Sequence, residues 1–445
     1  MPYKAMLQTA MNSRPKTRSF LVAATLLTCF VLRIGPQLAQ IVTVPPAVVM
    51  AQTPAPDFAG ATIPFELITR HIALKVRVNN SRPLTFIFDT GDQFAIINLE
   101  RAKELGLNLS GSLSVSGAGA ERAVGAYVKE ASFTIPALPG FSQPVNLALP
   151  LNNLSARLGQ DFDGIIGSDF IKHFVVEVDY QAHVLKLHNQ TKFVYSGPGQ
   201  TVPIQLVNGH PILNTEVTPA GGEPIRGKFV LDLGAGLALA LYSPFVTQHQ
   251  LLGPNARTVP APAGAGAGGE TRGRLGRVSE LQIGKYKIAE PITLFSQDKA
   301  GAFASSSLAG NIGARIASKF RLFLDYGRNQ IIFEPNATFT EPVDYALTGA
   351  SIIAEGNDYR TFRVREVVEN SAASEAGLQK DDIVVAVNGS PASDMTLSHL
   401  NDLLERPMVQ KLKIRRGELT LTVTLNPRRI AGVTTTTAQA AGVKR

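Results

Sequence analysis

The chain has 445 residues, of which 44% are apolar and 18% are charged. This composition excludes an intrinsically disordered chain, and the length predicts about three domains at ~100–200 residues each. The formal net charge is +8, but residues 1–51 and 428–445 hold basic residues and no acidic ones, so the remainder is close to neutral. The charge therefore gives no reason to expect a nucleic-acid partner. Because the single cysteine is Cys29, the remainder has neither disulfides nor cysteine-ligated zinc.

The N-terminal segment has the pattern of an export signal. Basic residues precede an apolar run at residues 20–32, and Arg33 ends this run. The run is too short for a membrane-spanning helix, which requires ~20 residues, and it suits the core of a signal peptide. We expect residues 1–51 to direct export to the periplasm or the extracellular space; an uncleaved membrane anchor is the alternative. Residues 52–60, rich in proline and alanine, are expected to form a linker, and residues 429–445 a disordered tail.

An internal repeat organises the middle of the chain. The first block contains an apolar strand that ends in Asp89-Thr-Gly, followed by a Gly-Ile-Ile-Gly segment that ends at Gly167. The second block contains a similar strand that ends in Asp232-Leu-Gly, followed by Gly-Asn-Ile-Gly that ends at Gly313. The spacing from the aspartate to the last glycine is 78 residues in the first block and 81 in the second. This self-similarity predicts two copies of one structural unit.

The local pattern of both blocks indicates a mostly β structure. Short apolar-alternating runs are separated by Gly, Pro and Asn, which is typical of strands joined by turns. A further strand is expected at the end of each block, over residues 184–187 and 330–333. The clearest helix of the first block is predicted from Asn98 to Leu105. We expect the blocks to form two lobes, at residues 61–192 and 193–340.

At these residues the chain resembles the aspartic peptidases, specifically the retropepsin-like families. The resemblance implies two homologous β lobes with a cleft between them, where Asp89 and Asp232 form a catalytic dyad. Two adjacent carboxyl groups share one proton because they cannot both ionise cheaply, and the ionised member activates a water that attacks the peptide bond. The resemblance implies no metal or other cofactor. It assigns support of the active-site loops to Thr90, Gly91, Gly234, Gly167 and Gly313.

Three positions depart from the pattern of these families. Leu233 stands where Ser or Thr is usual, so the second loop lacks a hydroxyl that could bond across to the first loop. Asp92 adds a third carboxylate; facing inward it would raise the pKa of the dyad, whereas facing outward, the orientation we expect, it would cap the turn. Asn311 replaces an apolar residue in the second Gly-x-x-Gly segment. These departures keep open the alternative of a pseudo-peptidase that binds peptides without hydrolysing them.

Two segments are expected to form flaps over the cleft. The first is a hairpin at residues 112–128 around Gly117-Ala-Gly, and the second is the glycine-rich segment 259–274. The second segment contains the spelling Gly-x-Gly-x-x-Gly from Gly264 to Gly269. Because prolines precede it and no helix follows, we do not expect a dinucleotide site there.

The segment 341–428 resembles a PDZ domain of the bacterial type. The resemblance is carried by a strand, a Ser-Ala-Ala turn, Ala-Gly377-Leu, the Asp382-Ile strand and Asn388-Gly. It implies a sheet edge and a helix that together accept a peptide as an added strand, with the groove helix near residues 396–405. A structural cap on the lobes is the alternative. The residues expected at the peptide-binding groove are Leu347, Gly349, Ala350, Ser351, Ile352 and Leu400.

Other kinds of site are not expected. The seven histidines are scattered, which favours core or surface roles over metal binding, and no His-Glu-x-x-His, Gly-x-Ser-x-Gly or Gly-Asn-Ser-Gly-Gly signature is present. The leading hypothesis is an exported aspartic endopeptidase whose PDZ module recognises peptide or protein substrates. The alternatives are the pseudo-peptidase and a scaffold whose main activity is PDZ recognition. Membrane association is expected only through an uncleaved N-terminus.

Overall fold

The computed structural model describes residues 58–429, apart from 120, 262–263, 267 and 344–346. The expected signal segment, most of the linker and the tail from residue 430 onward lie outside the described residues. The described part belongs to one compact unit that extends from Pro45 onward. None of its helices is both long and apolar enough to cross a membrane.

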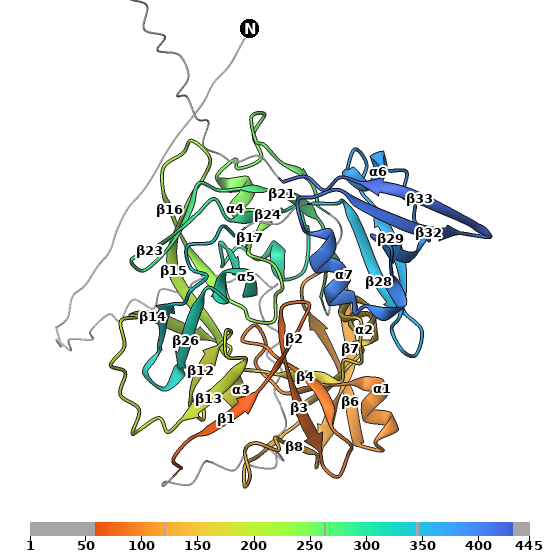
Figure 1. Cartoon of the computed structure of the whole chain (residues 1–445). Coiled ribbons are helices and arrows are strands. Elements are labelled where there is room, and N and C mark those ends of the chain that lie inside the picture. Colours follow the sequence, from red (N-terminus) through yellow and green to blue (C-terminus); the bar gives the residue numbers. More distant parts are fainter. Residues whose placement is uncertain (1–57, 120, 262–263, 267, 344–346, 430–445) are drawn as a thin grey trace, which may run out of the picture. The chain divides into compact units, whose positions relative to one another are not determined.

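The first lobe forms around β4 (Leu84–Phe88), whose residues are all buried. β11 (Gly164–Ile166) pairs with β4 in parallel, and β5 (Ile96–Asn98) pairs with β11 in antiparallel orientation. β10 (Leu147–Leu149) lies parallel to β5 on its other side. Such continuous apolar runs are expected of strands that are buried on both faces. The other elements of this lobe are β2 (Glu66–Ile68), β3 (His71–Val78), α1 (Leu99–Glu104), β6 (Asn108–Ser116), β7 (Arg122–Lys129), β8 (Ser132–Thr134), β9 (Ser142–Pro144), α2 (Asn152–Leu158) and α3 (Ser168–Ile171) (Figure 1).

The second lobe repeats this arrangement. β16 (Ile225–Leu231) pairs in parallel with β25 (Gly310–Ile312), which pairs in antiparallel orientation with β17 (Leu239–Leu241). β24 (Ile292–Ser296) lies parallel to β17. The pairing order of the two lobes is therefore the same, which confirms the predicted repeat. The other elements are β15 (His210–Thr218), α4 (Ser243–Gln248), β18 (Val259–Pro260), β19 (Gly264–Gly266), β20 (Gly269–Thr271), β21 (Gly273–Arg277), β22 (Glu280–Ile283), β23 (Tyr286–Ala289), and α5 (Ala314–Ala317), with short 3-10 turns at Ala302–Ala304 and Tyr326–Arg328.

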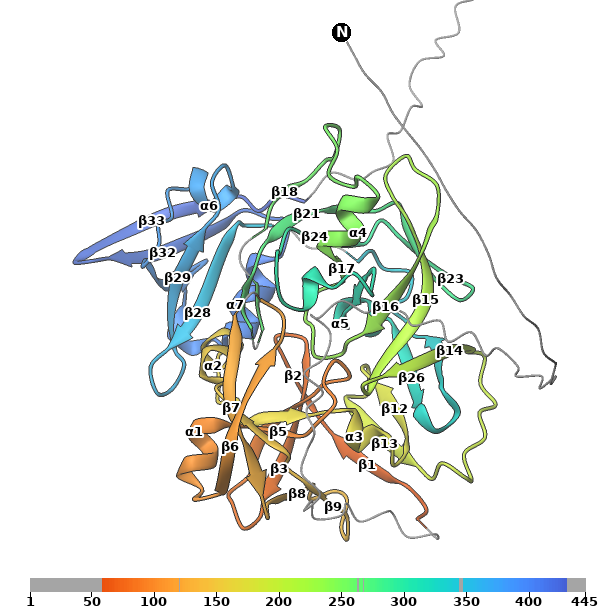
Figure 2. The same ribbon diagram turned by 180° about the vertical axis from the view of Figure 1, so that it is seen from behind.

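A shared sheet joins the two lobes. Its central pair is β12 (Val175–Asp179) of the first block and β26 (Phe320–Asp325) of the second, with Val176 opposite Leu324. The expected final strand of each block is present: residues 184–188 pair with β12, and residues 330–335 pair with β26. Both predictions are therefore confirmed. Figure 2 shows these strands below the second lobe. The sheet continues on both sides in the order β1 (Ala61–Pro64), β13 (Val184–His188), β12, β26, β27 (Gln330–Pro335) and β14 (Gln200–Val207).

Helix α1 illustrates how local sequence sets an element. The side chain of Asn98 caps its first turn by accepting a hydrogen bond from the backbone N–H of Glu100 at 3.0 Å. The helix ends at Glu104, and Gly106 follows with a φ of +63°, in the left-handed region that glycine adopts without strain. The predicted helix is therefore confirmed.

The C-terminal module has its own sheet and its own apolar core. The strand order is β28-β29-β30-β32-β33, so β28 lies at the edge, and Phe362, Val364 and Leu400 are fully buried in the core. Helix α7 (Leu397–Leu404) coincides with the predicted groove helix and begins at the cap Thr396. The remaining elements of the module are β28 (Ala350–Glu355), β29 (Thr361–Val367), α6 (Ala372–Glu375), β30 (Ile383–Val387), β31 (Ser390–Pro391), a 3-10 turn (Ala392–Asp394), β32 (Gln410–Arg416) and β33 (Leu419–Leu425).

Candidate active site

The two Asp-x-Gly loops follow the central parallel strands of the two lobes. The backbone N–H of Asp89 donates to the carbonyl of Ile166 at 3.0 Å, and that of Asp232 donates to Ile312 at 2.9 Å. Each aspartate is therefore held at the end of its strand by the same bond to the neighbouring parallel strand. Both side chains are half-buried.

The loops lie against each other across the lobe boundary. A Cβ atom placed on Gly234 would lie 2.1 Å from the carboxyl carbon of Asp89, and one on Gly91 would lie 2.6 Å from that of Asp232. Both distances are shorter than any van der Waals contact allows. Only glycine permits the aspartate of each lobe to approach the loop of the other lobe this closely.

Gly167 and Gly313 lie behind the loops at matching places. A Cβ on Gly167 would lie 2.6 Å from the carbonyl oxygen of Phe94, and one on Gly313 would lie 2.3 Å from that of Leu237. The residue after Gly167 donates its backbone N–H to the carbonyl of Asp92 at 2.9 Å, and the residue after Gly313 donates to Ala235 at 2.8 Å. The Gly-x-x-Gly segments thus support the two loops from behind.

Thr90 forms the cross-lobe hydrogen bonds, and it does so from one side. Its hydroxyl donates to the carbonyl of Leu231 at 2.6 Å and accepts from the backbone N–H of Leu233 at 2.9 Å. Leu233 is fully buried in the apolar core that the lobes share. The structure therefore joins the loops through one hydroxyl, and the second loop contributes packing instead of a reciprocal hydroxyl bond.

The two carboxyl groups lie in an environment that favours one shared proton. Burial, the charges of Asp232 and Asp92 and the hydrogen bond that protonated Asp89 can donate to Asp232 raise the pKa of Asp89 well above its usual value. Asn311 donates its Nδ2 to Oδ2 of Asp232 at 2.7 Å. The other oxygen, Oδ1, is buried and receives no hydrogen bond from the described residues, so it is an acceptor open to a proton. The replacement in the second Gly-x-x-Gly segment therefore supplies a donor to one carboxyl of the pair.

Asp92 lies within the electrostatic reach of the pair, which corrects the expected outward orientation. Burial, followed by the charges of Asp232 and Asp169, raises the pKa of Asp92 to about 7. Burial likewise raises the pKa of Asp169 to about 6. The backbone carbonyl of Asp92 accepts a hydrogen bond from the N–H of Ser168 at 2.9 Å, which fixes the backbone of Asp92 beside the supporting segment. The site thus contains further carboxyl groups that sequence reasoning placed at the surface or did not consider.

Asp92→Asn is expected to move the alkaline limb of the pH–activity profile to lower pH and to leave the acid limb in place. Below a pH of about 7 the carboxyl of Asp92 is protonated and neutral, so its removal changes little. Above that pH its charge holds the pKa of Asp89 high. Without this charge, Asp89 loses its proton earlier. The measurement is kcat/KM against pH, with exposed Asp402→Asn as the control; an unmoved alkaline limb in folded Asp92→Asn would contradict the assignment.

Two histidines lie beside the loops, a placement that sequence reasoning did not anticipate. His71 and His210 are the first residues of β3 and β15, which are equivalent strands of the two lobes. Burial lowers the pKa of both histidines. The charge of Asp232 acts in the opposite direction, and so does a hydrogen bond to a backbone carbonyl of the opposite loop. This carbonyl is that of Gly234 for His71 and that of Gly91 for His210. Each histidine directly follows a turn and begins the strand that precedes the aspartate strand, and this matching position in the repeat is the sequence signal that could have identified them.

The two expected flaps meet each other. The pairing of β6 with β7 confirms the predicted hairpin of the first segment, and the second segment forms β18, the glycine-rich hairpin β19–β20 and the start of β21. At their tips the backbone N–H of Glu121 donates to Gly268 at 2.7 Å, and that of Gly268 donates to Ala118 at 3.0 Å. Ala302 adds a bond to Gly117 at 3.0 Å. The glycines of the second flap therefore serve a close backbone contact, and no helix follows them.

The predicted groove residues of the C-terminal module lie on β28 and α7. Ile352 and Leu400 belong to the same buried core, and a Cβ on Gly349 (φ +78°) would meet Ser371. Leu347 forms an isolated bridge with Arg428, and Ala350 and Ser351 begin the edge strand. Helix α2 of the first lobe contacts both β28 and α7. A Cβ atom placed on Gly159, the residue that ends α2, would lie 2.5 Å from the Cβ of Leu397 in α7.

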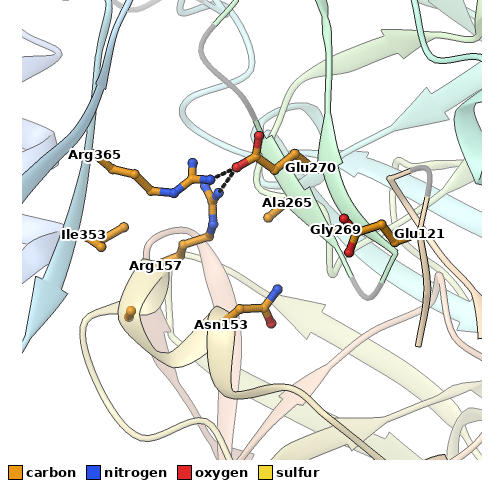
Figure 3. A pocket seen from close by; sticks show the side chains of 9 residues that line it. Glu121, Asn153, Arg157, Ala265, Gly269, Glu270, Ile353 and Arg365 are labelled. Carbon is orange, nitrogen blue, oxygen red and sulfur yellow. Dashed lines mark ion pairs between the residues drawn. The ribbon is translucent and has the colours of Figure 1, made fainter. Parts of the chain in front are cut away.

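The C-terminal module also contacts the second flap. Arg365 of β29 and Arg157 of α2 both pair with Glu270 on β20, the latter at 3.9 Å. Figure 3 shows both guanidinium groups directed at Glu270, beside a cavity of about 400 Å³ that Glu121 of the first flap also lines. The flaps, α2 and the module are thus joined at one place.

The described residues contain no group of three or more His, Cys, Asp or Glu side chains arranged to hold a metal ion.

Comparison with known families matches residues 74–170 to the aspartyl protease family and residues 363–416 to the PDZ domain. A search of the curated proteins finds no match to this chain. The first match covers the loop of Asp89 and its supporting glycine. The chain therefore combines an aspartyl protease domain of the retropepsin-like type with a C-terminal PDZ domain.

Proposed function

We propose that the chain is an aspartic endopeptidase in which Asp89 and Asp232 form the catalytic pair. The observation that carries this proposal is the mutual approach of the two loops, in which the glycine of each loop lies against the carboxyl of the other. The raised pKa of Asp89 supports its role as the protonated member. The donor from Asn311 and the open Oδ1 support Asp232 as the ionised member.

The proposed reaction needs only these two groups and a water molecule. Asp232 takes a proton from the water as its oxygen attacks the peptide carbonyl carbon, and Asp89 gives its proton to the carbonyl oxygen. The resulting gem-diol then collapses: Asp232 passes its proton to the leaving nitrogen, and Asp89 recovers a proton from a hydroxyl of the gem-diol. The C–N bond breaks, and both carboxyl groups return to their initial protonation states.

We further propose that the PDZ domain binds an extended peptide beside β28 and that the chain acts outside the cytoplasm. The position of β28 at the edge of its sheet and the neighbouring α7 support the first proposal, because a strand at a sheet edge accepts an added strand. The basic and apolar N-terminal pattern supports the second. Cell fractionation that recovers an unprocessed chain in the cytosol would overturn the proposed export.

Hydrolysis of a mixed peptide library by the purified chain, with products identified by mass spectrometry, tests the main proposal. We expect internal cleavage that a statine-type transition-state mimic suppresses, because such a mimic places a hydroxyl between the two carboxyl groups. The buried Leu233 favours a second candidate, a pseudo-peptidase, since it removes one cross-lobe hydroxyl bond. Tight binding of the statine peptide without hydrolysis of any library member would favour that candidate.

A further inference from the structure

A carboxylate of the PDZ domain joins both peptidase lobes. Glu405 directly follows α7, and its two oxygens bind different arginines: Oε2 pairs with Arg70 of the first lobe at 2.7 Å, and Oε1 pairs with Arg315 of the second lobe at 2.5 Å. The side chains of Glu405 and Arg315 are only 25% and 14% exposed. The charge-assisted bond between Glu405 and Arg315 is therefore stronger and more directional than a pair at the open surface, whereas Arg70 is 38% exposed.

Arg70 belongs to the turn that packs on one side of the Asp232 loop. This turn joins β2 to β3, and its residues Thr69 and Arg70 have φ values of +43° and +76°. A Cβ placed on Gly236 of the loop would lie 3.3 Å from the carbonyl oxygen of Thr69 and 3.1 Å from Cε1 of His71. The backbone N–H of Thr69 also donates to Ser398 Oγ of α7 at 3.3 Å. Contacts with α7 therefore hold this turn.

Arg315 belongs to the helix that supports the other side of the same loop. It lies in α5, directly behind the supporting Gly313, and its backbone N–H donates to the carbonyl of Leu237 at 3.2 Å. The preceding residue, Ala314, donates to Ala235 at 2.8 Å. A displacement of α5 would therefore change the position of the loop that carries Asp232.

The arrangement is specific to the second loop. In the repeat, Asp169 and Gly209 of the first loop's support match Arg315 and Arg70. Neither has a cationic side chain that could pair with a carboxylate. The second loop is also the one in which Leu233 replaces a hydroxyl residue, so among the described residues the cross-lobe hydroxyl bonds come from Thr90 of the first loop. The carboxylate of Glu405, which comes from another domain, thus pairs with the support of the Asp232 loop, the loop that has fewer hydrogen bonds of its own to the other lobe.

We infer that Glu405 of the PDZ domain is a positioning residue for the Asp232 loop, which makes the PDZ domain part of the support of the active site. This inference rests on the proposed peptidase function. It assigns to the domain a role in addition to peptide recognition, because both oxygens of Glu405 are bound to arginines of the lobes.

Glu405→Gln in the full chain tests the inference. The amide keeps the size of the side chain but lacks the charge and presents an N–H group to one arginine. We expect kcat to fall by about 10-fold with little change in KM, since a small misplacement of one catalytic group slows the reaction without weakening substrate binding. Asp402→Asn is the matched control, because Asp402 pairs with Arg70 at 3.2 Å at a more exposed position; it should keep the wild-type kcat.

Hydrogen exchange provides a second readout that does not depend on hydrolysis. We expect faster amide exchange at residues 232–238 in Glu405→Gln and no change at residues 89–95. Arg70→Gln, which leaves the PDZ domain untouched, should give the same pattern if Glu405→Gln fails to fold. Unchanged exchange at residues 232–238 in folded variants would overturn the inference even if the wild type proves inactive. In an active wild type, an unchanged kcat in Glu405→Gln would do the same.

Discussion

Asp89→Asn and Asp232→Asn are each expected to reduce peptide hydrolysis by ~10²–10⁴-fold, the usual contribution of a general acid or base. An amide cannot exchange a proton with the water or with the peptide oxygen. The side chain remains nearly isosteric, so the loops should keep their contacts through Thr90 and the two glycines. The measurement is kcat/KM for a peptide that the wild type cleaves, with exposed Asp358→Asn as the control.

Asp89→Asn is also expected to change the stability of the folded chain. The pKa of Asp89 is raised in the folded chain, so the folded state binds its proton more tightly than the unfolded state does. Ionisation of Asp89 therefore costs stability above the unfolded-state pKa. Asp89→Asn should melt at the same or a higher temperature near neutral pH, and the difference should vanish in acid.

Full activity in either folded Asn variant would show that the catalytic carboxyl groups lie elsewhere.

Gly234→Ala is expected to reduce kcat by about 10²-fold or more, because the new methyl group occupies the place of the Asp89 carboxyl. A Cβ at this position would lie 2.1 Å from both Cγ and Oδ2 of Asp89, so the two loops must move apart. The two carboxyl groups must lie close enough to share one proton, so moving the loops apart prevents the proton transfers that hydrolysis requires. The effect should fall on kcat more than on the stability of either lobe.

Gly222→Ala is the matched control for this substitution. Its Cβ would meet only Pro219, at an ordinary contact distance of 3.4 Å, and its backbone lies outside the left-handed region. We expect wild-type kcat and melting temperature for this variant. If Gly234→Ala kept the wild-type kcat in a folded protein, the two loops would not be in contact and the proposed pair would be wrong.

Much of the fold was predictable because its signals are local. Each aspartate directly follows a buried apolar strand, each supporting glycine ends a short apolar segment, and these patterns recur at nearly the same spacing. A repeat of this kind implies a repeated unit whatever the rest of the chain does. For the same reason α1 was predicted close to its observed bounds, since its cap Asn98 is a signal within one turn, whereas the position of α7 was implied by the resemblance to PDZ domains.

The errors and omissions concern contacts between residues far apart in the chain. Asp92 was expected to face outward, but burial and the charges of Asp232 and Asp169, which come near it only in the folded chain, raise its pKa to about 7. His71 and His210 were considered only as scattered histidines, because nothing local indicates that their turns pack on the opposite loop. Asn311 was interpreted as a departure from the pattern, whereas in the structure its amide binds Asp232.

The sequence by itself thus determined the repeated β units, the candidate pair Asp89 and Asp232, and the separate C-terminal module, because each depends on patterns within a short segment. Only the tertiary structure decided what surrounds that pair. The raised pKa of Asp89, the contact between the two flaps and the pairing of Glu405 with both lobes arise where distant segments meet. Burial and charge–charge interactions depend on distances in space, and distances in space between separate segments are set by how the whole chain packs.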